Sequence, residues 1–244
     1  DYKTHDGDPL LPFEGDSAVQ FGNEMLIDNR AVNTNDMFFD YMGNSKSVIV
    51  NSNDSASVSF RLNAGDDKYI EFVYMLHDQD WMMDYSVNFV NMNEILAQNV
   101  NFIRLNWSAK LPQLEKGRKW ETQNTTLQYR FEDGDIEKLN ERKEEDESSS
   151  AANVNWVAYK QQFFSTVLIN DENFEEPVFS AQTFETGKYI EQLNAELTLP
   201  YMHEAQKTYD MQFYFGPNKF STLKSYDRDL EEIIPLGRSV FSWV

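Results

Sequence analysis

The sequence has no cysteine among its 244 residues, which excludes disulfides, thiolate metal sites and cysteine nucleophiles. It has only three histidines, although histidine is the commonest acid–base catalyst near neutral pH. No stretch approaches the roughly 18 consecutive apolar residues of a membrane-spanning helix, and the longest apolar cluster, residues 163–169, has the length of a buried strand. No signal peptide is visible. Because the chain begins abruptly at Asp1 and stops abruptly at Val244, we interpret it as an excised piece of a longer protein.

Basic residues are also scarce. Lys and Arg number 21 against 41 Asp and Glu, which gives a formal net charge of −20. Binding to nucleic acid through phosphate contacts needs a basic surface, so nucleic-acid partners are excluded. Adsorption of the whole chain to anionic lipid headgroups is disfavoured for the same reason. The charge balance by itself predicts solubility and self-repulsion.

Motifs that carry chemistry are missing as well. His203-Glu204 begins like the zinc-protease pattern His-Glu-x-x-His, but Lys207 stands where the second histidine is required. The acidic spacing that begins at Asp133 resembles a calcium loop, but Lys138 replaces the glycine at its sixth position. There is no nucleophile elbow and no phosphate-binding glycine-rich loop. We therefore predict no catalytic residue, no cofactor and no metal site, and a protein that is not an enzyme.

Aromatic residues are abundant, with 18 Phe, 12 Tyr and 5 Trp, and such side chains favour strands. Apolar and polar residues alternate with a period of two, which predicts antiparallel strands with one solvated face. These stretches are residues 84–90, 102–109, 127–131, 193–199 and 211–215. Residues 69–76 and 156–169 are apolar on nearly both faces, which predicts central strands. Turn residues at 63–67, 77–80 and 133–134 separate the strands.

Helical patterns are few. A short helix is predicted within 114–124, and another over 218–231, after Gly216-Pro217, where apolar residues recur at helical spacing. Residues 141–152 form a charged, serine-rich run that predicts a mobile acidic loop. Because similar strands flank this loop, we treat it as an insertion within a single domain that spans 1–244. The fold class is therefore all-β, an antiparallel sandwich with a few short helices.

Several segments carry a family resemblance. Residues 156–169 resemble a signature strand of YidC-type membrane protein insertases, and residues 214–217 are similar to the family's Tyr-x-Gly-Pro motif. Residues 233–244 resemble the run-in to the family's membrane core, and residues 119–130 resemble its Bacteroidetes branch. The signature positions are Trp156, Gln161, Phe163, Phe164, Tyr214, Gly216 and Pro217. Together these segments resemble the periplasmic domain of such an insertase.

The resemblance implies a galactose-mutarotase-like β-supersandwich with helical elements near the C-terminus. It implies a non-catalytic domain, on the periplasmic side of a multi-pass inner-membrane protein, that helps to insert and fold membrane proteins. The family works alone or with the Sec translocon, so the implied partners are nascent membrane proteins and Sec subunits. The family's working groove lies in a transmembrane core, which is absent from this sequence, so no functional residue is carried over.

Two surfaces are candidates for interaction. The first is the predicted helix with the terminal run-in, whose apolar residues are expected to lie near the bilayer, with Trp243 at headgroup level. The alternative is that these residues pack under the sandwich. The candidates are Phe220, Leu223, Ile233, Ile234, Leu236, Phe241 and Trp243. The second surface is a groove between the sheets that accepts an extended chain by strand addition, although no residue marks it.

Two other functions stay open. A carbohydrate-binding or mutarotase-like protein requires His77 and His203 to converge near a carboxylate, because that chemistry uses histidines and an acid in one cleft. A free-standing lipoprotein or surface-binding module is the third reading. The parent sequence beyond both ends distinguishes it from an insertase domain, which has apolar membrane spans there.

Overall fold

The computed structural model describes residues 2–4, 7, 9–13, 15, 18–43, 45, 47–50, 54–139 and 145–235, with the backbone alone for 145–147. The candidate residues Leu236, Phe241 and Trp243 lie outside the described residues, as do residues 140–144 of the predicted acidic loop. The last described residue, Pro235, follows the helical elements near the C-terminus.

Antiparallel strands make up most of the described chain, which confirms the predicted all-β class. The order along the main sheet is β2-β1-β7-β13-β12-β14-β6-β5-β4-β3, and β10, β11, β8 and β9 branch from it at β12. The strands are β1 Val19–Ile27, β2 Arg30–Asn33, β3 Asp40–Tyr41, β4 Ser55–Asn63, β5 Tyr69–His77, β6 Met82–Val90, β7 Phe102–Pro112, β8 Thr126–Phe131, β9 Ile136–Lys138, β10 Glu145–Ser149, β11 Val154–Lys160, β12 Phe164–Thr183, β13 Tyr189–Pro200 and β14 Gln206–Pro217.

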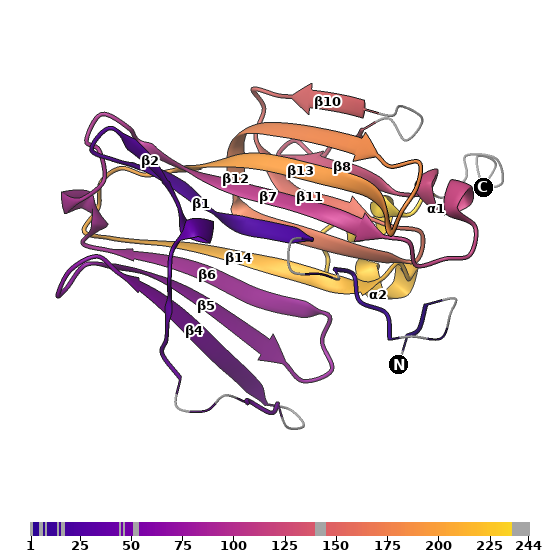
Figure 1. Cartoon of the computed structure of the whole chain (residues 1–244), viewed down its shortest axis with the longest axis horizontal. Coiled ribbons are helices and arrows are strands. Elements are labelled where there is room, and N and C mark those ends of the chain that lie inside the picture. The colour runs from indigo at the N-terminus through magenta and orange to yellow at the C-terminus, as the bar shows by residue number, and fades with distance from the viewer. Residues whose placement is uncertain are drawn as a thin grey trace.

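The long strand β12 belongs to both halves of the fold. Its first part pairs with β14 and β11, and its last part pairs with β13 and β10. Between the two parts, Asn173 and Glu176 have positive φ angles of 66° and 43°, which side chains other than glycine rarely adopt and which bend the strand sharply. The sheet therefore curls so that β4, β5, β6 and β14 face β1, β7 and β13 (Figure 1).

The core lies between these two layers. The predicted alternation is confirmed in β6, where Tyr85, Val87 and Phe89 are buried, and in β7, where Ile103, Leu105 and Trp107 are buried. Rings from separate strands meet there: the Trp107 and Tyr159 rings stack with centroids 3.7 Å apart. The Tyr159 hydroxyl also donates a hydrogen bond to the Trp107 carbonyl at 2.7 Å. The core thus combines large aromatic surfaces with satisfied polar groups.

The apolar stretch 156–169 is a hairpin and not one central strand. β11 ends at Lys160, a turn over residues 161–163 follows, and β12 begins at Phe164. The Gln161 amide nitrogen donates to the Phe164 carbonyl at 2.8 Å, which closes the turn. The apolar pattern correctly predicted that these residues are buried on both faces of the sheet. Hydrophobicity alone does not show that the chain reverses direction within the stretch.

The helix predicted over 218–231 is wrong in extent. The α-helix α2 covers only Phe220–Lys224, and a 3₁₀ turn, η3, covers Leu230–Ile233. Asp227 and Asp229 between them have left-handed φ angles of 55° and 56°, which interrupt the helical hydrogen bonds. The apolar residues whose spacing predicted one helix pack against the sheet from two short helical elements instead. Similarly, α1 covers Arg118–Thr122 and not the whole of 114–124.

The acidic run predicted as a mobile loop contains a strand. β10, Glu145–Ser149, pairs with residues 178–182 of β12 at the edge of the sheet. Strand pairing uses backbone groups, and edge strands tolerate charged side chains, so composition alone did not exclude it.

The two ends of the sandwich differ in construction. At one end lie α1, α2 and the N-terminal segment (Figure 1). We call this the terminal end; its connecting segments are residues 78–81, 113–125, 161–163, 184–188 and 218–224. We call the opposite end the far end; its connecting segments are residues 28–29, 64–68, 91–101 and 201–205.

Candidate functional site

An apolar groove opens on the inner face of β3–β6. The cavity has a volume of about 710 Å³, which lies within the range of roughly 300–1,000 Å³ that is typical of ligand pockets. Its lining side chains are almost all apolar: Tyr41, Val48, Val50, Ala56, Val58, Phe60, Tyr74, Leu76 and Met83. Such a groove binds by hydrophobic contact rather than by charge.

The groove follows from the curl of the sheet. Residues 70, 72, 74 and 76 of β5 share one face, because side chains alternate along a strand. Ile70, near the far end, is fully buried beneath the opposite layer, whereas Leu76, on the same face, is 49% exposed. The layers diverge along β5, so a face patterned to be core becomes an uncovered wall.

The edge of this wall is incompletely paired. β3 has only two residues, Asp40 and Tyr41, and these pair with Arg61 and Phe60 of β4. Within the described residues, β4 is paired along its full length only with β5. Residues 55–58 therefore present backbone donors and acceptors at a sheet edge, which is a template for another strand.

Exposed large apolar side chains concentrate around this edge. They include Met37, Phe38, Met42, Val48, Ile49, Phe60 and Leu76, and Phe38 is 96% exposed. Contiguous exposed apolar surface of this kind is typical of interaction sites. We name the groove together with the β4 edge and these residues the edge groove.

Charge is kept away from the walls of the edge groove. Arg61 forms an ion pair with Glu71 at 3.3 Å, and its guanidinium lies 3.9 Å from the centre of the Tyr69 ring. Burial raises the pKa of Tyr74 to about 12, so this phenol stays neutral at physiological pH. Asp54 and Asp78 lie together near the start of β4, because the Asp78 amide donates to the Asp54 carbonyl at 3.1 Å. The site can hold an apolar chain, and its described lining offers no nucleophile or general base.

Most signature residues have structural roles. Trp156 is buried, and its indole N–H donates to the Arg228 carbonyl at 3.2 Å. The Gln161 side chain donates to the Pro112 carbonyl at 2.9 Å, and the Tyr214 hydroxyl donates to the Pro217 carbonyl at 2.6 Å. A Cβ atom at Gly216 would lie 2.5 Å from the Tyr214 ring, so only glycine fits there.

The phenylalanines of the signature lie at the terminal end. Phe164 contacts the Tyr2 ring at 4.8 Å, with the two rings edge to face, and Phe163 in the adjoining turn is exposed. Phe164 therefore joins the N-terminal segment to the sheet, whereas Phe163 is available to a partner.

The predicted interaction surface near the C-terminus needs correction. Leu223 and Ile233 are fully buried in a second hydrophobic cluster, together with Trp156, Leu230 and Tyr214. This cluster covers the outer face of the sheet, so both residues are packing residues, as the alternative reading had it. Of the remaining described candidates, Phe220 is exposed and Ile234 is partly buried.

Polar contacts fasten the same C-terminal segment to the sheet. Arg228 contacts Asp171 of β12 and the Gln212 side chain of β14, and Arg130 of β8 pairs with Asp229 at 2.8 Å. A cavity of about 400 Å³ lies beside Arg228. These polar groups contact one another, and they therefore hold the C-terminal segment in place on the sheet.

One carboxyl of this polar region has a shifted pKa. Asp84 accepts hydrogen bonds from Gln212 at 2.8 Å and from His77 at 2.7 Å. Partial burial by itself raises the pKa of Asp84, but these hydrogen bonds and the charge of His77 outweigh it and hold the pKa below 3.8.

The histidines do not converge. His77 ends β5, one residue beyond the pairing of Leu76 with Met83 of β6. His203 lies in the loop before β14, whose first residue, Gln206, pairs with Val90 at the other end of β6. The seven residues from Met83 to Val90 along β6 correspond to about 23 Å at ~3.3 Å per residue, so the two histidines lie toward opposite ends of this strand. The cleft required by the mutarotase-like reading is therefore not formed by this pair.

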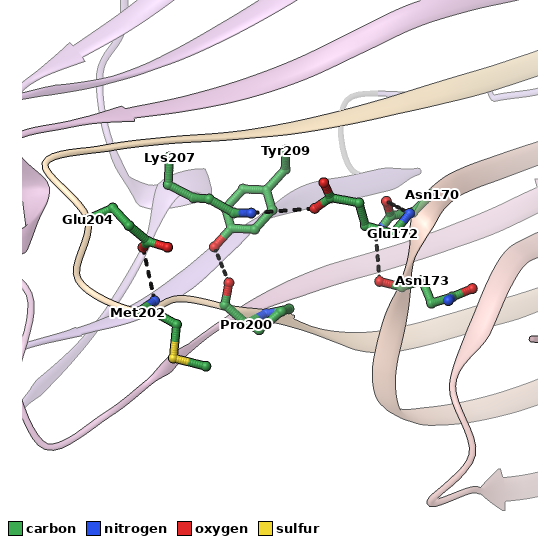
Figure 2. Close-up of polar contacts among 8 residues, drawn as sticks. All are labelled: Asn170, Glu172, Asn173, Pro200, Met202, Glu204, Lys207 and Tyr209. Atoms are coloured by element: carbon green, nitrogen blue, oxygen red, sulfur yellow. Dashed lines mark hydrogen bonds and ion pairs between the residues drawn. The ribbon is translucent and has the colours of Figure 1, made fainter.

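Polar residues near His203 have structural partners of their own (Figure 2). The Glu204 carboxylate accepts a hydrogen bond from the Met202 amide at 3.1 Å, and Lys207 pairs with Glu172 at 3.4 Å. The Tyr209 hydroxyl donates to the Pro200 carbonyl at 2.8 Å. These contacts close the far-end loop. Across the described part of the chain, no group of three His, Cys, Asp or Glu side chains is placed to hold a metal ion.

Comparison with known proteins decides the family. Residues 10–244 match the family described as the YidC periplasmic domain. The chain belongs to this family. It is 36% identical over its whole length to the membrane protein insertase YidC of Parabacteroides distasonis and 34% identical, over 98% of its length, to that of Azobacteroides pseudotrichonymphae. The predicted resemblance to a Bacteroidetes YidC periplasmic domain is thus confirmed.

The chain spans 38% and 39% of the lengths of these two YidC relatives. A galactose mutarotase-like protein from Lactobacillus casei is similar in structure with a TM-score of 0.44 and 11% identity, covering 81% of this chain and 85% of the other. Among the described residues, no helix is long and apolar enough to cross a membrane.

The sequence predicted a groove between the sheets, but it did not indicate the residues that form the edge groove. One signal was present: Ala56, Val58 and Phe60 alternate with serines and an arginine in the manner of a half-buried strand. Their common face predicts burial, and only the divergence of the layers leaves them uncovered.

Proposed function

We propose that this YidC periplasmic domain is a non-catalytic part of an inner-membrane protein insertase, and that its edge groove receives extended apolar segments of nascent membrane proteins. Family membership supports the insertase role, since the relatives are named membrane protein insertases. The observation that carries the finer claim is an uncovered apolar wall beside residues 55–58 of β4, whose outer edge has no strand partner among the described residues.

The groove suits an extended chain for two reasons. The β4 edge can supply backbone hydrogen bonds to an added strand, which gives affinity without regard to sequence. The side chains of Val58, Phe60 and Leu76 can cover every second residue of that strand, which selects apolar segments. Segments of this kind are exposed while a membrane protein is being inserted and folded, so the domain acts by shielding them.

The proposal includes the setting of the whole protein. The domain lies on the periplasmic side of a multi-pass inner-membrane protein, and this insertase works alone or with the Sec translocon. Contact with Sec subunits stays a prediction, since no described residue marks a place for them.

Groove binding is tested by titrating the chain with an unfolded apolar peptide and following backbone amide shifts. Leu76→Asp places a charge on the exposed wall and should weaken binding at least about tenfold, because burying a charge costs more than about 1.4 kcal/mol. Ser57→Asp puts the same charge on the opposite face of neighbouring β4 and should leave binding unchanged. Absence of shifts in β4 and β5 on adding the peptide to the unsubstituted chain would falsify the groove assignment.

The insertase role is tested in the full-length protein. Insertion of a client with a long periplasmic segment should fall in the Leu76→Asp variant and not in Ser57→Asp. Equal insertion by both variants and the unsubstituted protein would separate the groove from the activity of the insertase.

A further inference from the structure

The strand β4 has two chemically different faces beside the edge groove. The side chains that line the groove are apolar: Ala56, Val58 and Phe60. The side chains that alternate with them and point to the opposite face are hydroxyls: Ser55, Ser57 and Ser59. Ser55 and Ser57 are exposed, and the Ser59 hydroxyl donates to the Glu71 carboxylate at 3.0 Å. A strand added to this edge would have an apolar groove on one side and a polar, solvated surface on the other.

The backbone groups that are open to an added strand belong to the serines. The Met42 amide donates to the Ser59 carbonyl at 3.0 Å, so the backbone groups of Ser59 point toward the outer edge. Every second residue of an antiparallel strand directs its N–H and C=O to the same side, so Ser57 also points these groups outward. No strand that the structure describes pairs with Ser57 on this side. An incoming strand therefore finds both a donor and an acceptor at Ser57.

This arrangement determines which residues of an added strand face the groove. A residue directly opposite Ser57 places its side chain on the same face of the sheet as Ser57, which is the solvated face. The residues before and after it point to the other face, beside Ala56 and Val58, and enter the groove. A bound segment therefore buries apolar side chains only at every second position.

Residues 47–50 of the chain itself contact the groove in this manner. Val48 and Val50 line the groove, whereas Ile49 between them is 77% exposed. The groove already meets this segment through alternate side chains and leaves the intervening one in solvent.

We infer that the preferred ligand of the edge groove is an amphipathic segment in which apolar and polar residues alternate with a period of two. In a continuously apolar segment, half of the side chains would face solvent beside Ser55 and Ser57 and would add no burial. Alternating segments are typical of sheets with one solvated face, so the ligand class is an unpaired strand from a β-structured region of a client protein. The inference rests on the proposed function and narrows the ligand of the same groove.

Two peptides of equal composition test this inference. One has the sequence Val-Ser-Val-Ser-Val-Ser-Val and the other Val-Val-Val-Val-Ser-Ser-Ser, and both carry two C-terminal lysines and blocked ends. Each is titrated into the chain while the backbone amide shifts are followed. A bound strand of the alternating peptide presents four valines to the groove and one of the block peptide presents two, so the alternating peptide should bind at least about tenfold more tightly.

The outcomes separate the two proposals. Equal affinity of the peptides, or tighter binding of the block peptide, with shifts in β4 and β5 would overturn the inference and leave the proposed function standing. If neither peptide shifts the amides of β4 and β5, the groove is not a binding site and both proposals fail.

A cross-linking experiment measures the orientation of the bound strand. The chain has no cysteine, so Ser57→Cys and its matched control Ala56→Cys each introduce a single thiol, on opposite faces of the same edge. An alternating peptide with cysteine in place of its central serine should form a disulfide faster with Ser57→Cys, because a disulfide requires Cβ atoms that point toward each other. With cysteine in place of an adjacent valine, the order should reverse. Equal rates in the two variants would contradict the inferred alternation.

Discussion

The strands are connected in different ways at the far end and at the terminal end of the sandwich. At the far end the strands are joined by turns with left-handed residues such as Asp28, Asn91 and His203, and the charged side chains lie in solvent. At the terminal end, the segment that contains α1 is held by buried or partly buried polar side chains, among them Glu121 and Arg118. Local backbone geometry is enough to form a tight turn, whereas the α1 segment needs hydrogen bonds with residues distant in the sequence.

The largest effect should come from removing the buried anchor. Glu121 is fully buried, and its carboxylate accepts hydrogen bonds from the Leu114 and Glu115 amides at 2.9 and 3.0 Å. Glu121→Ala leaves both donors without this partner and should lower the free energy of unfolding by about 3 kcal/mol. Glu204→Ala at the far end removes one exposed contact, which water replaces, and should cost about 0.5 kcal/mol. Urea unfolding measures both values, and equal losses would abolish the distinction between the ends.

A smaller effect should come from the guanidinium that ties α1 to the β12–β13 turn. Arg118 donates to the Phe184 and Tyr189 carbonyls, each at 2.6 Å. Arg118→Gln should cost about 2 kcal/mol, because several charge-assisted hydrogen bonds are lost together. The far-end counterpart, Lys207→Gln, breaks one exposed ion pair with Glu172 and should cost less than about 0.5 kcal/mol. Thermal unfolding compares the two, and a greater loss for Lys207→Gln would reverse the comparison.

The smallest effect concerns acid. The pKa of Asp84 is below its usual value in the folded chain, so its stabilising contribution is present above about pH 4 and is lost as the pH falls through the lowered pKa. The side chain is 43% exposed, so solvent limits the contribution to less than about 0.5 kcal/mol. In the Asp84→Asn variant, the free energy of unfolding should therefore fall less steeply as the pH is lowered from about 4 to about 2. Asp210→Asn serves as the control, and identical pH profiles for the two variants would contradict the assignment.

Much of the sheet was predictable because alternation is a local property. The buried faces of β6 and β7 appear directly in the sequence as every second residue. The turns at 63–67 and 133–134 were also predictable: the Ala64 amide donates to the Lys68 carbonyl at 2.8 Å, and Gly134 adopts a φ of 101° that favours glycine.

The helical elements near the C-terminus were predicted less well. Apolar spacing over 218–231 fits one helix, but Leu223 and Leu230 reach the same cluster through two short elements and a bend. Spacing reports which residues are buried, and it does not distinguish between two backbone paths that bury them equally.

The candidate sites depended still more on tertiary structure. Val58 and Leu76 have the pattern of core residues, and only the divergence of the layers exposes Leu76 in the edge groove. The helices α1 and α2 are far apart in the sequence, and only strand pairing brings them to one end.

By itself the sequence determined an antiparallel β protein, poor in histidine, lacking cysteine and strongly acidic, and its signature segments determined the family. The tertiary structure decided where the strands curl apart and which helices share an end. The physical reason is range: alternation and turn chemistry act between neighbours in the chain, whereas the edge groove and the grouping of α1 with α2 arise from pairings such as that of β12 with both β13 and β14.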